Sequence, residues 1–142
     1  MIVIGRDEEI ADWVYFNLFG IAKHEFGKCT AIGFAVDGYL IGGVVFHNYQ
    51  TKIDGSPLFI EASIATVDKR WATRQNLKHI FMYAFGQLKL KRMQAITAVS
   101  NERAKTMLRK LGFKQEGTAR FAYPTGEHAC IFSMLSHECR WI

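Results

Sequence analysis

Apolar residues recur every three or four positions in three stretches of the chain, residues 7–19, 71–88 and 101–111. This spacing places the apolar side chains on one face of a helix, so each stretch is predicted to be helical and to pack on a core. Acidic residues open the first stretch, and Gly20 follows it. Both features are typical of helix ends, so the first helix is predicted to end at Gly20.

Seven shorter runs are rich in apolar and β-branched residues, which favours strands. They cover residues 2–4, 31–36, 39–46, 58–67, 93–99, 113–123 and 129–135. Asp37 and Gly38 separate two of these runs, and this dipeptide is a strong signal for a two-residue hairpin. Residues 58–67, 71–88 and 93–99 form a β-α-β unit, which predicts one crossover in a mostly antiparallel sheet.

The composition fits one globular domain. The 142 residues are 49% hydrophobic and 22% charged, so a single α+β domain over residues 1–142 is predicted.

No apolar run reaches the roughly 20 residues that span a bilayer. Charged residues stand where a signal peptide would have its apolar region, so a cytoplasmic protein is expected. The three cysteines and five histidines show no metal-binding spacing, and no metal site is expected.

Residues 101–117 carry the most specific pattern of the chain. Asn101 is predicted to cap a helix, Gly112 to end it in the left-handed conformation, and Phe113 to lead into the next strand. The order Asn-x-x-Ala, then Leu-Gly-Phe, then Glu-Gly resembles the last helix and following strand of the GNAT superfamily of acyl-CoA-dependent N-acyltransferases. The resemblance extends over about residues 58–135.

This resemblance implies a mixed, mostly antiparallel central sheet flanked by helices, with a splayed central β-α-β unit. In the GNAT fold, the gap between the splayed strands exposes backbone groups that pair with the pantetheine arm of coenzyme A. The pyrophosphate binds amide groups that open the next helix. Acetyl-CoA, or another acyl-CoA, is therefore implied as cosubstrate, and the implied activity is acyl transfer to an amine.

Applied to this chain, the resemblance places the coenzyme site at the end of the first splayed strand and in the turn that follows. The implied residues are Thr66, Val67, Arg70, Trp71, Ala72, Thr73, Arg74 and Asn101. The turn departs from the family pattern, because residues 67–75 contain no glycine. Arg70, Thr73 and Arg74 are expected to supply side-chain donors instead. Trp71 is expected to pack in the core, with an adenine platform as the alternative.

Positive charge is concentrated in the same part of the chain. Between Asp68 and Arg120 there are thirteen Lys or Arg residues against three Asp or Glu, although the whole chain has a net charge of only +5. Such a segment fits a phosphate-bearing ligand, either coenzyme A or nucleic acid. Charge alone does not choose between the two.

An amine acyltransferase has to remove a proton from the amine and return one to the departing thiolate. Glu61 is the only ionisable residue in an apolar strand, at the place where several GNAT enzymes have a glutamate base, so it is the candidate base. The alternative is a glutamate that faces solvent. His47 and Tyr49 are further candidates for the same cleft, with ordinary hydrogen bonds at the edge of a loop as the alternative.

The general acid is not decided by the sequence. Many relatives carry a tyrosine four residues after the alanine of the motif, and this chain has Leu108 there. Tyr123, Tyr83 or water are the alternatives.

Short motifs near the C-terminus and at residues 83–85 resemble a group of GNAT-like proteins associated with phages and prophages. This group implies a second hypothesis, a phage Mom-type enzyme that modifies adenine in DNA. A third hypothesis is a GNAT-shaped acyl-CoA-binding protein without catalysis. The expected partners are therefore a coenzyme A thioester and a small-molecule or protein amine, with DNA as the alternative. No membrane partner is expected, and a homodimer is compatible with the fold.

Overall fold

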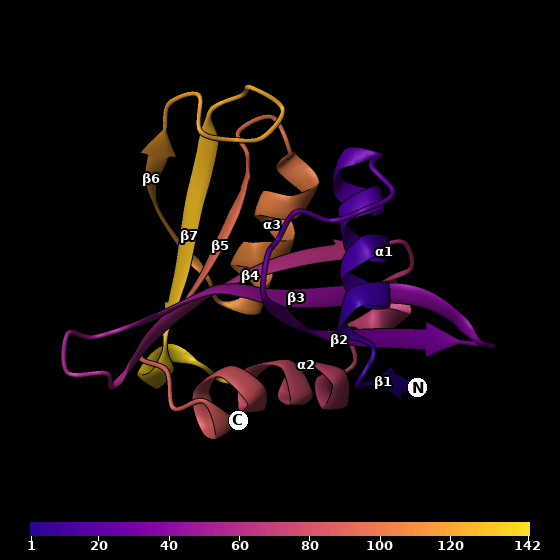
Figure 1. The fold of residues 1–142 in the computed structure, drawn as a ribbon, viewed down its shortest axis with the longest axis horizontal. Coiled ribbons are helices and arrows are strands. Elements are labelled where there is room, and N and C mark those ends of the chain that lie inside the picture. The colour runs from indigo at the N-terminus through magenta and orange to yellow at the C-terminus, as the bar shows by residue number, and fades with distance from the viewer.

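A seven-stranded sheet with the strand order β1-β2-β3-β4-β5-β7-β6 forms the centre of the molecule (Figure 1). The computed structural model describes residues 1–142. The strands are β1 (Ile2–Val3), β2 (Cys29–Val36), β3 (Tyr39–Thr51), β4 (Pro57–Thr66), β5 (Arg92–Ala98), β6 (Lys114–Ala119) and β7 (Ala129–Leu135). All neighbours are antiparallel except β4 and β5, as the predicted β-α-β crossover requires.

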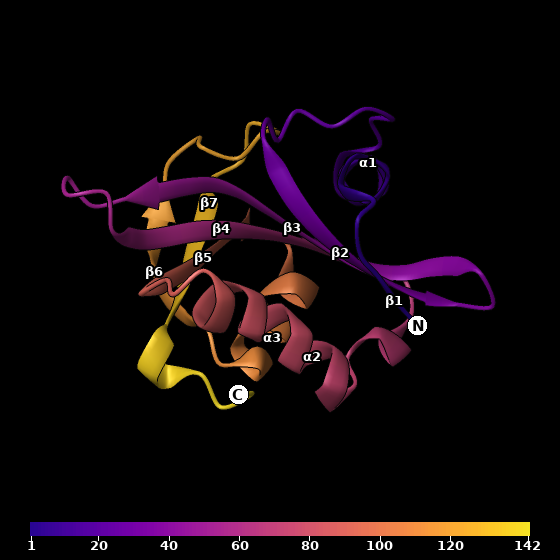
Figure 2. The same cartoon turned by 60° about the horizontal axis from the view of Figure 1, so that its bottom comes forward.

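Helices cover both faces of the sheet. Figure 2 shows α1 (Asp7–Phe19) on one side of the strands, and α2 (Arg74–Phe81) and α3 (Glu102–Leu111) on the other. A cluster of 22 buried residues fills the side of α2 and α3, whereas the cluster under α1 has six. Most of the hydrophobic stabilisation therefore lies on the α2 and α3 side. None of the helices has the length and apolar composition that crossing a membrane requires.

The parallel strands β4 and β5 separate after a short ladder. They pair at three positions only, the last of which joins Glu61 to Gln94. Beyond this point residues 62–66 of β4 and 95–98 of β5 have no partner between them, although each strand stays paired on its outer edge. The splayed central unit expected from the sequence is confirmed.

The local signals read from the sequence are confirmed at several turns and caps. The Asn101 side chain accepts a hydrogen bond from the backbone N–H of Ala104, and Gly112 ends α3 with a φ of +109°. Asp37 and Gly38 both have positive φ, as a two-residue hairpin of this type needs.

Three elements differ from their predicted boundaries by more than two residues. The helix predicted over residues 71–88 begins as α2 only at Arg74, because Thr73 is extended and caps it, and it continues as a π-helical segment over Met82–Gln87. The strand predicted over 113–123 stops at Ala119, the last residue that pairs with β7. β3 continues to Thr51, because the pairing with β4 resumes after a bulge beyond the predicted end.

Candidate active site

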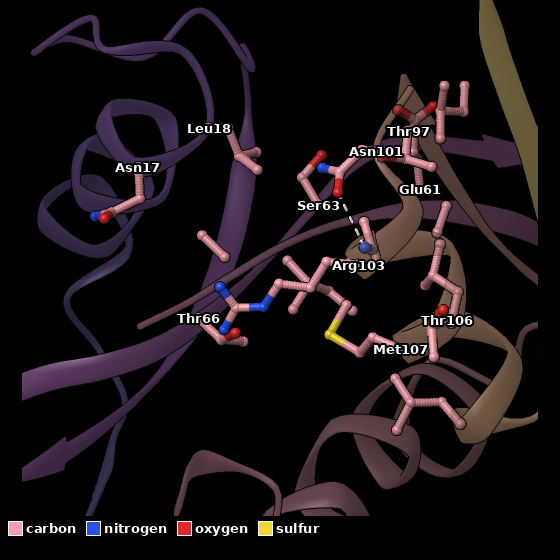
Figure 3. A pocket seen from close by; sticks show the side chains of 18 of the residues that line it. Asn17, Leu18, Glu61, Ser63, Thr66, Thr97, Asn101, Arg103, Thr106 and Met107 are labelled. Atoms are coloured by element: carbon pink, nitrogen blue, oxygen red, sulfur yellow. Dashed lines mark hydrogen bonds between the residues drawn. The ribbon is translucent and has the colours of Figure 1, made fainter. Parts of the chain in front are cut away.

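The fork between β4 and β5 opens into a cleft of about 1160 Å³. One wall consists of the separated strands and α3, and the opposite wall comes from α1 and the loops that follow α1 and β6. Figure 3 shows Asn17 and Leu18 on α1 across the cleft from Arg103, Thr106 and Met107 on α3.

The open edge of β4 lies along this cleft. Every residue from Glu61 to Thr66 lines it, as do residues 95–97 of β5. Backbone groups that face a partner in an ordinary sheet are here directed toward the cleft, so an extended ligand can pair with them as an added strand. This is the geometry that the GNAT resemblance implied for pantetheine.

Glu61 lies at the base of the fork and faces His47 on β3. The two residues are directly paired across the antiparallel ladder, and Glu61 Oε2 is 3.8 Å from His47 Nε2. Their side chains are only 16% and 12% exposed, and both line the cleft. The Nε2 atom of His47 is also 2.9 Å from Ser63 Oγ. The structure therefore places the largely buried Glu61 side chain in the cleft, with His47 lining the same cleft.

Burial shifts the protonation of both groups toward the neutral form. It lowers the pKa of His47 to about 4, so the imidazole is neutral at pH 7 and the contact with Glu61 is not an ion pair. Burial also raises the pKa of Glu61, while hydrogen bonds from Gln94 and Asn48 act in the opposite direction. A carboxylate with a raised pKa is a stronger proton acceptor than an exposed one.

Aromatic side chains form the wall of the cleft opposite the fork. Tyr15 and Phe19 of α1 pack together with ring centroids 4.7 Å apart, and Phe19 lies 5.7 Å from Tyr123 in the loop after β6. Phe26 connects this wall to the catalytic candidates, because its ring centroid is 4.7 Å from that of His47. Aromatic rings thus extend along this wall as far as His47.

Of the two tyrosines left open as proton donors, only Tyr123 lines the cleft. Tyr83 packs on Phe46 in the core instead, with ring centroids 4.8 Å apart. Burial and the nearby Glu127 raise the pKa of Tyr123, so its phenol stays protonated at neutral pH. Leu108 is buried in the core, 3% exposed, and offers no polar group to the cleft.

Tyr49 is placed away from the cleft. The chain bulges between His47 and Gln50, where Asn48 has a φ of +54°, and Tyr49 is 46% exposed and not among the residues that line the cleft. The sequence prediction could not anticipate the bulge, because it ended the strand at residue 46 and so placed Asn48 beyond it.

The residues implied for the coenzyme divide into two groups. Four line the cleft, namely Thr66, Trp71, Ala72 and Asn101, and four do not, namely Val67, Arg70, Thr73 and Arg74. Arg70 forms a bidentate ion pair with Asp68, and Arg74 lies over the Trp141 ring, 5.9 Å from its centroid. Thr73 caps α2 by accepting from the N–H of Asn76. These side chains already have partners within the protein.

Trp71 packs in the core, as expected, and it also reaches the cleft wall. It lies directly against β3, where a Cβ on Gly42 would be only 2.8 Å from Trp71 Cβ. In the family pattern, glycines in this turn let the backbone come close to its neighbours. Residues 67–75 contain no glycine. Here a glycine on the neighbouring strand brings the turn close to the sheet.

Sequence reasoning missed three cations that line the cleft, Lys69, Arg103 and Lys110. Arg103 extends from the first turn of α3 across the cleft toward Thr66 (Figure 3). It stands two residues after Asn101, inside the motif that identified the fold. The sequence signal that could have identified Arg103 as a cleft residue was its position in that motif. The 67–75 turn, on which the prediction relied, does not contain it.

A second group of polar side chains joins α1 to the loop after it. Donor atoms of Glu8, His24 and Cys29 lie within 4.8 Å of one another. The N–H of Phe26 donates to His24 Nδ1, so in the neutral ring Nε2 carries the proton and donates to Glu8. Burial and nearby acids raise the pKa of Cys29 to about 11. This group therefore fits a hydrogen-bonded anchor for the Phe26 loop better than a metal site.

Comparison with known proteins is consistent with this geometry. No protein-family model matches the chain. The Bacillus subtilis (strain 168) protein YdaF, provisionally named a ribosomal N-acetyltransferase, is 29% identical over 138 residues, which is 94% of this chain and 70% of the relative. A GNAT-family acetyltransferase of Streptococcus pneumoniae has the same fold, with a TM-score of 0.67 and 16% identity over 95% of this chain and 98% of that one. In sequence the chain is similar to an N-acetyltransferase, and in fold it is similar to GNAT acetyltransferases.

Another GNAT-like fold is that of a spermidine N-acetyltransferase chimera of Vibrio cholerae SpeG and hSSAT. It aligns with a TM-score of 0.71 and 14% identity, over 96% of this chain and 97% of that chain. The predicted GNAT-like sheet and the predicted class of N-acetyltransferase are confirmed. These three relatives do not support the narrower assignment to a phage-associated group.

Proposed function

We propose that this GNAT protein transfers an acetyl group from acetyl-CoA to a primary amine, with Glu61 as the general base. The observation that carries the proposal is the buried carboxylate at the base of the fork, 3.8 Å from a neutral imidazole and beside the open edge of β4. A thioester paired with β4 would bring its carbonyl carbon to the same place from which an amine can reach Glu61.

GNAT acetyltransferases use acetyl-CoA, and the residues of the cleft fit this cosubstrate. The open backbone of residues 62–66 would pair with the pantetheine arm. Lys69, Arg103 and Lys110 line the same cleft, and their charges complement the phosphates. Because the Thr73 side chain already satisfies one amide at the start of α2, these cations would carry more of the phosphate binding than in a glycine-rich loop.

In the proposed reaction, the Glu61 carboxylate accepts a proton from the amine as the nitrogen attacks the thioester carbonyl carbon. The tetrahedral intermediate then collapses, the C–S bond breaks, and the thiolate takes a proton from the Tyr123 phenol. The products are the N-acetyl amine and coenzyme A. The raised pKa of Glu61 suits the first step, and the Tyr123 phenol is protonated at neutral pH, so its proton is available for the last.

The acceptor would enter from the aromatic wall, since the coenzyme occupies the fork and α3 side. Its amino group would lie beside Glu61, and its apolar part would contact Phe26 and Phe19. Both a small amine and a protein amine fit this description. The names of two relatives mention one acceptor of each kind. One name gives spermidine, a small amine, and the other gives a ribosomal substrate.

An acetylation assay with a panel of acceptors tests the proposal. Acetyl-CoA is incubated with the protein and spermidine, simple arylalkylamines, peptides with free N-termini, or duplex DNA, and both free thiol and acetylated product are measured. We expect equal amounts of thiol and N-acetyl amine with at least one amine, and no modified DNA. Tight binding of acetyl-CoA with no product from any amine would indicate a binding protein, and modified adenine would support the DNA hypothesis.

A further inference from the structure

A chain of hydrogen bonds runs from the surface of β6 to the Glu61 carboxylate. The Arg92 guanidinium donates to both carboxylate oxygens of Glu116, at 2.7 and 2.8 Å. Arg92 Nη2 also donates to Gln94 Oε1 at 2.9 Å, and Gln94 Nε2 donates to Glu61 Oε1 at 3.2 Å. The chain thus crosses from β6 to β4 through two side chains of β5.

Arg92 determines which end of the Gln94 amide faces Glu61. A guanidinium has donors only, so it has to be met by the amide oxygen, and the amide nitrogen is then directed to the carboxylate. Arg92 is itself held by the two bonds to Glu116 and by the Phe59 ring, whose centroid is 5.9 Å away. An unrestrained glutamine could present either end.

We propose that Gln94, oriented by Arg92, is a positioning residue that holds Glu61 in its ionised form and fixes its direction in the cleft. The proposal rests on the role of Glu61 as base described above. A hydrogen bond from the amide N–H₂ stabilises the carboxylate and has no comparable effect on the protonated acid. Burial alone would keep more of Glu61 protonated, and a protonated carboxyl group cannot accept the proton of the amine.

Other groups around Glu61 do not replace this bond. His47 on β3 is neutral at pH 7 and is hydrogen-bonded to Ser63, while Asn48 on β3 accepts a hydrogen bond from Gln50 and lowers the pKa of Glu61 less than Gln94 does. Arg92 on β5 and Glu116 on β6 form one ion pair, so their opposite charges largely cancel at Glu61. Gln94 is therefore the main contact that favours the ionised carboxylate.

Gln94→Met tests the proposal, because methionine keeps the length of the side chain and cannot donate. We expect the acid limb of the pH profile of kcat/KM to move to higher pH, with kcat/KM near neutral pH lowered by about tenfold, the scale of a hydrogen bond to a charged group. Activity should recover as pH rises. Gln75→Met on the exposed surface of α2 is the matched control and should leave the profile unchanged.

Gln94→Glu provides a second variant of nearly the same size. It places an acceptor opposite Glu61 and should move the acid limb further in the same direction. Arg92→Met frees the amide to rotate and should give a smaller shift. Thermal unfolding of each variant checks that it is folded.

A measurement independent of catalysis completes the test. The Glu61 carboxyl carbon, assigned in ¹³C-labelled protein by comparison with Glu61→Gln, should titrate at higher pH in Gln94→Met than in the wild type. An unchanged carboxyl titration in both Gln94 variants would overturn the proposal. If Glu61→Gln kept full activity, the role of Glu61 as base would fail, while the titration would still decide whether Gln94 controls its ionisation.

Discussion

Glu61 and His47 face each other across β4 and β3, with 3.8 Å between the carboxylate oxygen Oε2 and the imidazole nitrogen Nε2. The two groups do not share one role. The imidazole is neutral, has its pKa lowered to about 4, and is hydrogen-bonded to Ser63. The carboxylate has a raised pKa and borders the cleft. We therefore propose proton transfer by Glu61 and an orienting contact by His47.

Glu61→Gln should lower kcat by about 10²-fold or more, since the amide cannot accept the proton of the amine. The dissociation constant of acetyl-CoA, measured by titration calorimetry, should stay within about twofold because the amide keeps the shape of the side chain. Glu25→Gln is the control, as Glu25 is an exposed acid at the edge of the same cleft. Wild-type turnover in Glu61→Gln would assign the proton to water or to His47.

His47 should make the protein less stable as pH falls. Its pKa is about 4 in the folded protein and 6.5 for an unperturbed histidine, so between these values the unfolded chain binds more protons. The free energy of unfolding should then decrease as pH is lowered from about 6.5 to about 4. The raised pKa of Glu61 has the opposite effect and makes the protein more stable as pH falls. This contribution is present both in the wild type and in a variant that lacks His47.

Urea unfolding of the wild type and His47→Gln at pH 7 and pH 5 measures this contribution. The variant should lose less stability over the interval than the wild type does, whereas His79→Gln on the exposed side of α2 should behave like the wild type. Equal losses in the wild type and His47→Gln would show that His47 titrates normally in the fold.

Arg103→Ala should weaken acetyl-CoA binding by roughly tenfold, the scale of ~1.5 kcal/mol for a charge-assisted hydrogen bond. Arg70→Ala should change the affinity much less, because the guanidinium is already paired with Asp68. Arg74→Ala is expected to behave like Arg70→Ala, as Arg74 lies over Trp141 outside the cleft. The reverse order of effects in titration calorimetry would place the phosphates at the 67–75 turn.

Tyr123→Phe should lower kcat by about 10-fold to 10²-fold, because the thiolate loses its proton donor while the ring still packs on Phe19. Tyr83→Phe removes a hydroxyl from the core side of the sheet and should leave kcat unchanged. Single-turnover measurements with saturating acetyl-CoA separate this effect from binding. Equal rates for the wild type and Tyr123→Phe would leave water as the donor.

Gly42→Ala should destabilise the fold by about 1–3 kcal/mol, as expected for an added methyl group in a packed core. The new Cβ would be 2.8 Å from Trp71 Cβ, so the turn that leads to α2 would have to shift. Gly117→Ala is the control, since nothing lies within 4 Å of a Cβ there. Chemical denaturation of both variants tests the difference, and acetyl-CoA affinity should fall only in Gly42→Ala.

Much of the fold could be predicted from the sequence because the decisive signals are local. The cap at Asn101, the left-handed Gly112 and the Asp37-Gly38 hairpin each depend on a few consecutive residues, and the structure has all three. The motif around α3 was specific enough to indicate the GNAT family. Boundaries were less predictable, because β6 ends where its partner strand ends, not where its own pattern does.

The sequence by itself determined the fold class and the resemblance to the GNAT superfamily, because these follow from periodicity and a contiguous motif. It also nominated Glu61, the only ionisable residue of an apolar strand, at the place where that resemblance implies a base. Only the tertiary structure decided which polar groups share the cleft. Glu61 meets His47 and Gln94 through strand register, and a shift of one residue would turn each side chain to the opposite face. Arg70 and Arg103 look alike in the sequence, but Asp68 engages the first and leaves the second to line the cleft. Such pairings depend on distances across strands and turns, which no local pattern encodes.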